Sequence, residues 1–228
     1  MAWVLEAVSR APGVDTVAVA TDDARIADAV RSRGGIAVET PSSLPSGTDR
    51  VAMAAEILAR DSGSPGGCSG DDIVVNVQGD EPLIDPMLVA SLADVLRSNP
   101  QWDMATAAAP IASREDLLSP NVVKIVRGRD GGALYFSRSP IPAQRDGEAD
   151  FASGLFVRHL GIYAYRVSFL RRYVSEPPCA LERAEKLEQL RALWMGAKIA
   201  VLDVNDCGVG VDTPEDAERV AKILQNRG

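Results

Sequence analysis

The chain has 228 residues, with 24 Lys or Arg against 32 Asp or Glu, so its net charge is −8. This balance argues against a protein that binds nucleic-acid backbones nonspecifically, because such binding needs a basic surface. The apolar fraction of 46% is that of a globular protein with a sizeable core. No continuous apolar run reaches the roughly 18 residues of a membrane span.

The cysteine and histidine content limits which kinds of disulfide or histidine-based site the chain can form. The cysteines Cys68, Cys179 and Cys207 are odd in number and far apart, which argues against a disulfide framework and favours a reducing cytoplasm. The opening MAWVLEAVSRAPG has neither a basic segment nor a cleavage site, so no secretory signal is expected. His159 is the only histidine, which excludes a site built from several histidines.

In the first half of the chain, helical and strand patterns alternate. Helical spacing occurs at 2–11, 23–35, 48–60 and 85–99, and short strand patterns occur at 15–21, 36–40 and 72–78. The last of these strands is a nearly continuous apolar run, as expected for a strand buried on both faces. The alternation predicts an α/β fold with a mostly parallel sheet flanked by helices.

The second half is less regular. Strand patterns occur at 103–111, 122–127, 133–138, 159–166 and 198–204. We expect a small mixed β subregion around 121–166, a helix from about Leu181, and a last helix capped by Thr213. No linker composition interrupts the chain, so a single domain over 1–228 is predicted.

The segment VNVQGDEP (75–82) turns from a buried strand into a polar loop. In open α/β sheets ligands bind outside the carboxyl ends of strands, where Asp80 could hold Mg²⁺ on a triphosphate. The alternative is that Asp80 only caps the helix near Asp85. Asp212, in GVGVDTPED (208–216), either caps the next helix or shares a metal with Asp80.

Three further segments have both a functional and a structural interpretation. In PSGTDR (45–50), a helix start and Arg50 could bind an anion or form an ordinary cap. In VRHLGIYAYR (157–166), alternation sends His159, Tyr163 and Tyr165 to one face, which could bind a ligand or pack as an amphipathic strand. The polar pair Glu188 and Gln189 could face a site or solvent.

Taken together, VNVQGDEP, SGTDR, ALYFSR, RHLGIYAYR, KLEQLRALW and GVDTPED resemble the 3-deoxy-manno-octulosonate (KDO) cytidylyltransferases, or CMP-KDO synthetases. The resemblance runs in order from Val4 to the C-terminal helix. It implies a Rossmann-like nucleotidyltransferase, usually a homodimer, that makes CMP-KDO and pyrophosphate from CTP and KDO with Mg²⁺, for lipopolysaccharide biosynthesis.

The resemblance also implies roles for individual residues. Asp80 and Asp212 would be the catalytic, Mg²⁺-binding acids. The CTP side would comprise Ser46, Gly47, Arg50 and Gln78. The KDO side would comprise Ser137, Arg138, Arg145, His159, Tyr163, Glu188 and Gln189.

The sequence departs from the family pattern at its front. The family opens with a strand and a triphosphate-binding loop of the type IPARxxSxRLPGKPL, about 25–30 residues that have no counterpart here. That strand normally lies between the strands at 15–21 and 72–78, so the chain as written is expected to be marginally stable and to have little or no CTP-dependent activity. Two alternatives stay open: transfer to a related acid sugar (8-amino-KDO or a sialate), and an inactive KDO-binding homologue.

Overall fold

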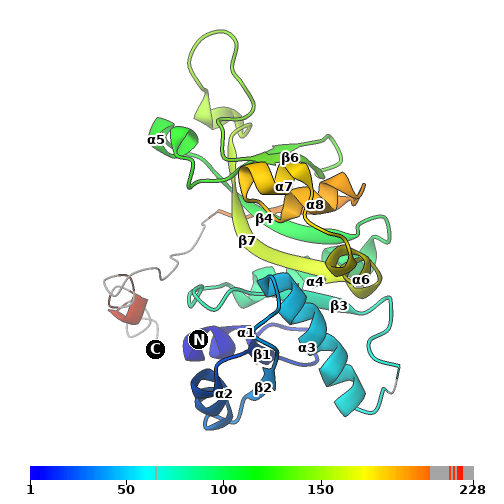
Figure 1. The fold of residues 1–228 in the computed structure, drawn as a ribbon. Helices are drawn as coiled ribbons and strands as arrows, with labels where there is room; N and C mark the ends of the chain where they lie inside the picture. Colours follow the sequence, from blue (N-terminus) through cyan, green and yellow to red (C-terminus); the bar gives the residue numbers. More distant parts are fainter. Residues whose placement is uncertain (65, 206–215, 217, 219, 223–228) are drawn as a thin grey trace.

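The computed structural model describes residues 1–64, 66–205, 216, 218 and 220–222. A mixed β-sheet forms its centre, with helices on both faces (Figure 1). The strands are β1 (Ala18–Thr21), β2 (Ile36–Glu39), β3 (Ile73–Asn76), β4 (Met104–Pro110), β5 (Lys124–Arg127), β6 (Ala133–Ser137), β7 (Val157–Arg166) and β8 (Ile199–Asp203).

The α/β class is confirmed, but the expectation of a mostly parallel sheet is wrong. Strand β7 runs antiparallel to β3, β4 and β5, and only the β4–β8 pair in this sheet is parallel among the described residues. The ten-residue β7 carries β4 along one edge, and β5 and then β3 along the other. The expected mixed subregion is therefore part of the main sheet, because β7 is long enough to pair with both halves of it.

The helices are α1 (Ala2–Val8), α2 (Ala24–Arg31), α3 (Gly47–Asp61), α4 (Pro86–Ser98), α5 (Arg114–Leu118), α6 (Val167–Ser175), α7 (Ala180–Glu185) and α8 (Gln189–Trp194), with a short 3₁₀ turn at Phe151–Ser153. Side chains alternate across a strand, so β4 contributes to two cores. Met104 packs with the apolar faces of α6 and α8, whereas Ala105 packs with α1 and α4. None of the described helices is long and apolar enough to cross a membrane.

The single helix expected from about Leu181 is two helices, α7 and α8. They are separated by Lys186, whose φ of 54° is left-handed. The guanidinium of Arg138 donates to the carbonyl oxygens of Glu185 and Lys186, which satisfies the end of α7. This tertiary contact ends the helix where sequence periodicity continues.

Strands β1 and β2 pair in parallel with each other, apart from the six-stranded sheet. Within the described residues, β1 pairs only with β2 and β3 pairs only with β7, so each keeps one unpaired edge. A cavity of about 1270 Å³ is lined by residues of both strands. The family resemblance implies an upstream strand at this position, and that strand stays a prediction.

The C-terminal part is described only at isolated positions. Residues 216, 218 and 220–222 are helical, and Val220 is buried. The predicted start of this helix at Thr213, together with Asp212 and Cys207, lies outside the described residues.

Candidate active site

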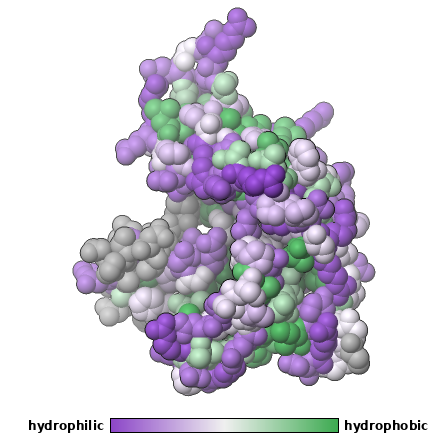
Figure 2. All heavy atoms as spheres, viewed as in Figure 1, coloured by the Kyte–Doolittle hydropathy of each residue, from purple (hydrophilic) through white to green (hydrophobic). Residues whose placement is uncertain are grey.

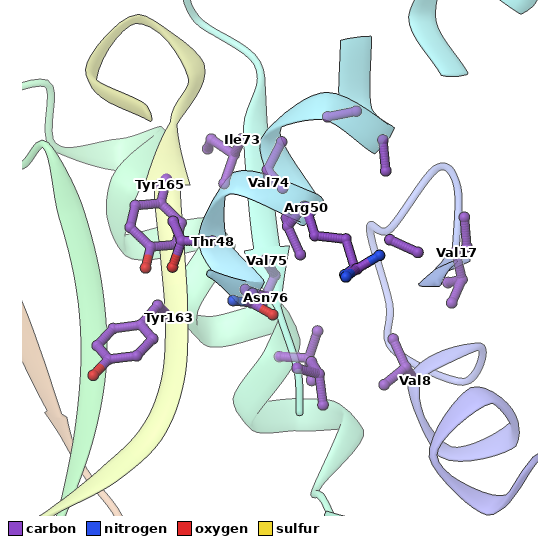
Figure 3. A pocket seen from close by; sticks show the side chains of 18 of the residues that line it. Val8, Val17, Thr48, Arg50, Ile73, Val74, Val75, Asn76, Tyr163 and Tyr165 are labelled. Carbon is purple, nitrogen blue, oxygen red and sulfur yellow. The ribbon is translucent and has the colours of Figure 1, made fainter. Parts of the chain in front are cut away.

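The large cavity brings together segments that are far apart in the sequence. Its walls come from the end of β3, the start of α3, one face of β7 and the turn between α7 and α8. Figure 3 shows Thr48 and Arg50 on α3, with Tyr165 on one side and Val17 on the other. Polar groups from four elements therefore converge on one cavity, as in small-molecule sites.

The turn after β3 presents Gln78 and Asp80 to the cavity. Asp85, rather than Asp80, caps α4, since its carboxylate accepts a hydrogen bond from the Met87 amide at 2.9 Å. The capping alternative for Asp80 is therefore wrong. The Gln78 side-chain amide donates to the Gly161 carbonyl oxygen at 3.0 Å, which fixes its place against β7.

The start of α3 is both a capped helix end and part of the cavity wall. Ser46 accepts a hydrogen bond from the Asp49 amide and does not line the cavity, whereas Gly47 and Arg50 do. The Arg50 guanidinium donates to Thr40 at 2.6 Å and pairs with Asp22 at 3.2 Å. Arg50 therefore ties α3 to the ends of β1 and β2.

The face of β7 that lines the cavity holds His159, Gly161, Tyr163 and Tyr165, as the alternation predicted. Burial lowers the pKa of His159 to about 3, because desolvation disfavours the charged imidazole. Burial also raises the pKa of Tyr163 and of Tyr165 above the usual value. All three rings are therefore neutral at physiological pH.

The turn before α8 presents Glu188 and Gln189 to the same cavity. The Glu188 carboxylate accepts a hydrogen bond from the Thr48 hydroxyl at 3.1 Å, and its carbonyl oxygen accepts one from Tyr173 at 2.8 Å. Gln189 is buried, not exposed on a helix surface. The surface alternative is therefore wrong for Gln189, whereas Glu188 is exposed and lines the cavity.

Three residues predicted on the KDO side do not line this cavity: Ser137, Arg138 and Arg145. Ser137 donates to the Glu185 carboxylate at 2.7 Å, and the Arg138 guanidinium donates to the carbonyl oxygens of Glu185 and Lys186 at the α7–α8 turn and to that of Pro120. They support the segment that carries Glu188. Arg145 is exposed on the loop at 140–150, which projects from the body and is mostly hydrophilic (Figures 1 and 2).

A buried lysine supports the same region. Lys124 has no exposed surface, and its ammonium donates to the carbonyl oxygens of Ser119, Val122 and Arg138 at 2.6–2.9 Å. Desolvation lowers its pKa from the usual value. A cation that is fully used by backbone oxygens is structural rather than ligand-binding.

The residues present are compatible with a magnesium ion. Mg²⁺ in nucleotide enzymes is typically held by one or two carboxylates, with substrate phosphates and water completing its shell. Asp80 supplies such a carboxylate on the cavity wall. The described residues contain no group of three or more potential ligands, and the second predicted acid, Asp212, lies outside them.

The fold and the polar cavity define an α/β nucleotidyltransferase. Residues 1–199 match the family model described as Cytidylyltransferase. The solved structure of a 4-diphosphocytidyl-2C-methyl-D-erythritol synthase shares the fold, with a TM-score of 0.61 at 14% identity over 97% of this chain and 86% of that one.

Closer relatives define the family. The 3-deoxy-manno-octulosonate cytidylyltransferase of Hahella chejuensis is 49% identical over 90% of this chain and 80% of its own length. The 3-deoxy-manno-octulosonate cytidylyltransferase of Syntrophobacter fumaroxidans is 48% identical over 97% of this chain and 84% of its own length. A CMP:2-keto-3-deoxy-manno-octonic acid synthetase solved with CTP has a TM-score of 0.86 at 37% identity, over 100% of this chain and 88% of that one. This chain belongs to the 3-deoxy-manno-octulosonate cytidylyltransferase family.

Sequence reasoning missed several residues that organise the site. Thr48 lies within the PSGTDR segment, but its link to Glu188 spans 140 positions and leaves no local signal. Thr106 is fully buried in an alanine-rich strand and looks like ordinary β-strand packing. Tyr173 falls on the apolar face of α6, so only its hydroxyl contact with Glu188 distinguishes it from a core residue.

Proposed function

We propose that this chain transfers CMP from CTP to KDO, with release of pyrophosphate. The observation that carries the proposal is the composition of the cavity: Asp80 and Gln78 from the end of β3 share it with His159, Tyr163, Glu188 and Gln189. The first pair suits a metal-bound nucleotide, and the second set suits a sugar with many hydroxyl groups. The relatives described above support this assignment.

On the nucleotide side, Asp80 would hold Mg²⁺, together with Asp212 from the part of the chain outside the description. Bound there, the ion would neutralise charge on the triphosphate and lower the barrier to transfer. Gln78 offers an amide, and Gly47 lies at the start of α3, where unpaired N–H groups favour anions. These residues orient CTP rather than react with it.

On the sugar side, the neutral hydroxyl and imidazole groups and the Glu188 carboxylate would position KDO. Its anomeric oxygen attacks the α-phosphorus of CTP, so a new O–P bond forms as the P–O bond to pyrophosphate breaks. The hydroxyl proton passes to solvent. With a pKa of about 3, His159 is a weak base, so positioning and charge neutralisation must supply most of the rate.

The direct test measures pyrophosphate release by the purified chain with CTP, KDO and Mg²⁺. Weak release that depends on KDO is expected, with still less release when 8-amino-KDO or a sialate replaces KDO. Release with a different acid sugar only would overturn the sugar assignment. Binding of KDO without any release would favour an inactive KDO-binding homologue.

The cellular location, the use of the product and the oligomeric state are also part of the proposal. The proposed reaction would take place in the cytoplasm, and its product would supply lipopolysaccharide biosynthesis. A homodimer is supported by large apolar side chains exposed on and beside the β5–β6–β7 end of the sheet, namely Leu118, Leu134 and Leu155. Sedimentation equilibrium should give twice the chain mass, and Leu134→Glu should shift it to the monomer.

A further inference from the structure

Thr106 on β4 lies opposite an irregularity in β7. Thr106 pairs with Tyr163, but the next residue of β4, Ala107, pairs with Leu160, so the register shifts by two positions. The Thr106 side chain is fully buried, and its Oγ1 lies 2.8 Å from the Ile162 carbonyl oxygen and 3.2 Å from that of Leu160. The Thr106 hydroxyl therefore lies within hydrogen-bonding distance of two backbone carbonyl oxygens at the shifted part of the ladder.

The same hydroxyl oxygen also lies 3.0 Å from Nε2 of His159. A threonine hydroxyl has one proton to donate, and the two carbonyl oxygens can only accept. If that proton went to Nε2, both carbonyl oxygens would face the lone pairs of Oγ1 at hydrogen-bonding distance. The contact set is satisfied when Thr106 donates to a carbonyl and the ring nitrogen of His159 donates to Thr106.

We propose that Thr106 is a positioning residue that fixes His159 as its Nε2–H tautomer, so that Nδ1 is a hydrogen-bond acceptor for a sugar hydroxyl in the cavity. The identification of the donor as a sugar hydroxyl rests on the proposed function. No hydrogen bond to Nδ1 comes from the described part of the chain. Among the described residues, only Glu182 Oε2 and Arg191 Nε are side-chain polar atoms that are both fully buried and without a hydrogen-bond partner. Nδ1 has no such partner and is not one of these two atoms, so it is not fully buried and a ligand can reach it.

The neighbours of the His159 ring and its burial favour a neutral imidazole. Phe136 meets it edge-on at a centroid distance of 5.3 Å, and Tyr163 lies tilted against it at the same distance. Burial lowers the pKa of the imidazole to about 3, so the ring carries no charge near neutral pH. A neutral acceptor selects a hydroxyl donor, whereas the carboxylate of an acid sugar or a phosphate would need a donor or a cation.

Because His159 is the only histidine in the chain, ¹⁵N NMR of the histidine-labelled protein reports this tautomer without overlap. The native protein at pH 7 should show a protonated Nε2 and an unprotonated Nδ1. Thr106→Val, which keeps the shape but removes the hydroxyl, should give a mixture or the opposite tautomer. Thr106→Ser, the matched control, should keep the native tautomer. A native ring protonated at Nδ1, or at both nitrogens, would overturn the proposal even if Thr106→Val fails to fold.

Steady-state kinetics test the sugar contact. Thr106→Val should raise KM for KDO by about 2- to 12-fold, the effect of one neutral hydrogen bond, with KM for CTP unchanged. Thr106→Ser should restore the native KM. An unchanged KM for KDO in a variant with an altered tautomer would overturn the sugar contact.

The two proposals can fail separately. If the chain shows no CMP transfer, the tautomer is still measured in the free protein. Titration with KDO should then move the Nδ1 resonance in the native protein and Thr106→Ser. No movement at saturating KDO would overturn the contact, whatever the activity.

Discussion

Asp80 occupies the position on the cavity wall where loss of one charge should have the largest effect on turnover. Asp80→Asn keeps the side-chain shape but removes the charge of the proposed Mg²⁺ ligand, so the rate of pyrophosphate release should fall by at least about 100-fold. The thermal midpoint should stay near that of the native chain. Asp28→Asn, the same change on the exposed surface of α2, is the control and should retain the native rate. Native turnover by Asp80→Asn at saturating Mg²⁺ would remove the metal role of this residue.

The His159 ring affects stability as well as binding. Its pKa of about 3 in the folded chain lies below the usual value near 6.5, so between these limits the unfolded state binds more protons. Stability therefore falls as the pH falls below about 6.5. The rings against His159, Phe136 and Tyr163, carry no charge that would offset this effect.

Urea unfolding at two pH values tests this linkage. From pH 7 to pH 5, His159 should cost the native chain about 2 kcal/mol of unfolding free energy, at about 1.4 kcal/mol per pH unit. His159→Gln lacks the titrating group and should lose correspondingly less over the same interval. Equal losses in the two proteins would show that His159 is protonated in the folded state.

At the scale of elements, the helix that carries Glu188 and Gln189 is held by a buried ion pair. Arg191 Nε of α8 lies 3.0 Å from Glu182 Oε2 of α7, and the Arg191 guanidinium stacks over the Tyr173 ring. Arg191→Met should destabilise the chain by about 3–5 kcal/mol, because it leaves Glu182 buried without its partner. The double variant Glu182→Leu/Arg191→Met should recover most of this loss in chemical denaturation. A double variant less stable than Arg191→Met would show that the charge on Glu182 is tolerated alone.

The contact between β7 and the turn after β3 depends on a glycine. A Cβ at Gly161 would lie 2.6 Å from Gln78 Nε2, so Gly161→Ala should displace that amide from its place in the cavity. The displaced atom ends a flexible side chain, so unfolding free energy should change by less than about 1 kcal/mol. KM for CTP should rise by about 2- to 12-fold. Gly66→Ala, where the added Cβ meets open space, is the control.

For the whole molecule, strand pairing predicts an uneven pattern of hydrogen exchange. Strand β4 pairs with β7 on one side and β8 on the other, whereas β1 pairs only with β2 within the described residues. Amides of Met104–Pro110 should therefore exchange slowest, and those of Ala18–Thr21 much faster. Exchange followed by mass spectrometry of peptides resolves the two strands. Equal protection of β1 and β4 would mean that the edge of β1 at the cavity is covered in solution.

Local patterns in the sequence determined most of the elements and one face of the site. Helix α4 follows from its periodicity and the Asp85-Pro86 start, and alternation along β7 placed His159, Tyr163 and Tyr165 on one face. These features depend on residues close in the chain, so composition and spacing express them. Family motifs added Asp80, Gln78, Glu188 and Gln189, which the structure brings to the same cavity.

Long-range contacts decided the rest. The break between α7 and α8 depends on Arg138, and the place of Glu188 depends on Thr48 and Tyr173, all distant in sequence. The antiparallel course of β7 and the shift opposite Thr106 likewise arise only when strands pair. Hydrogen bonds between distant segments leave no periodic signal in the sequence, so only the tertiary structure shows that the hydroxyl of the buried Thr106 contacts the ring of His159.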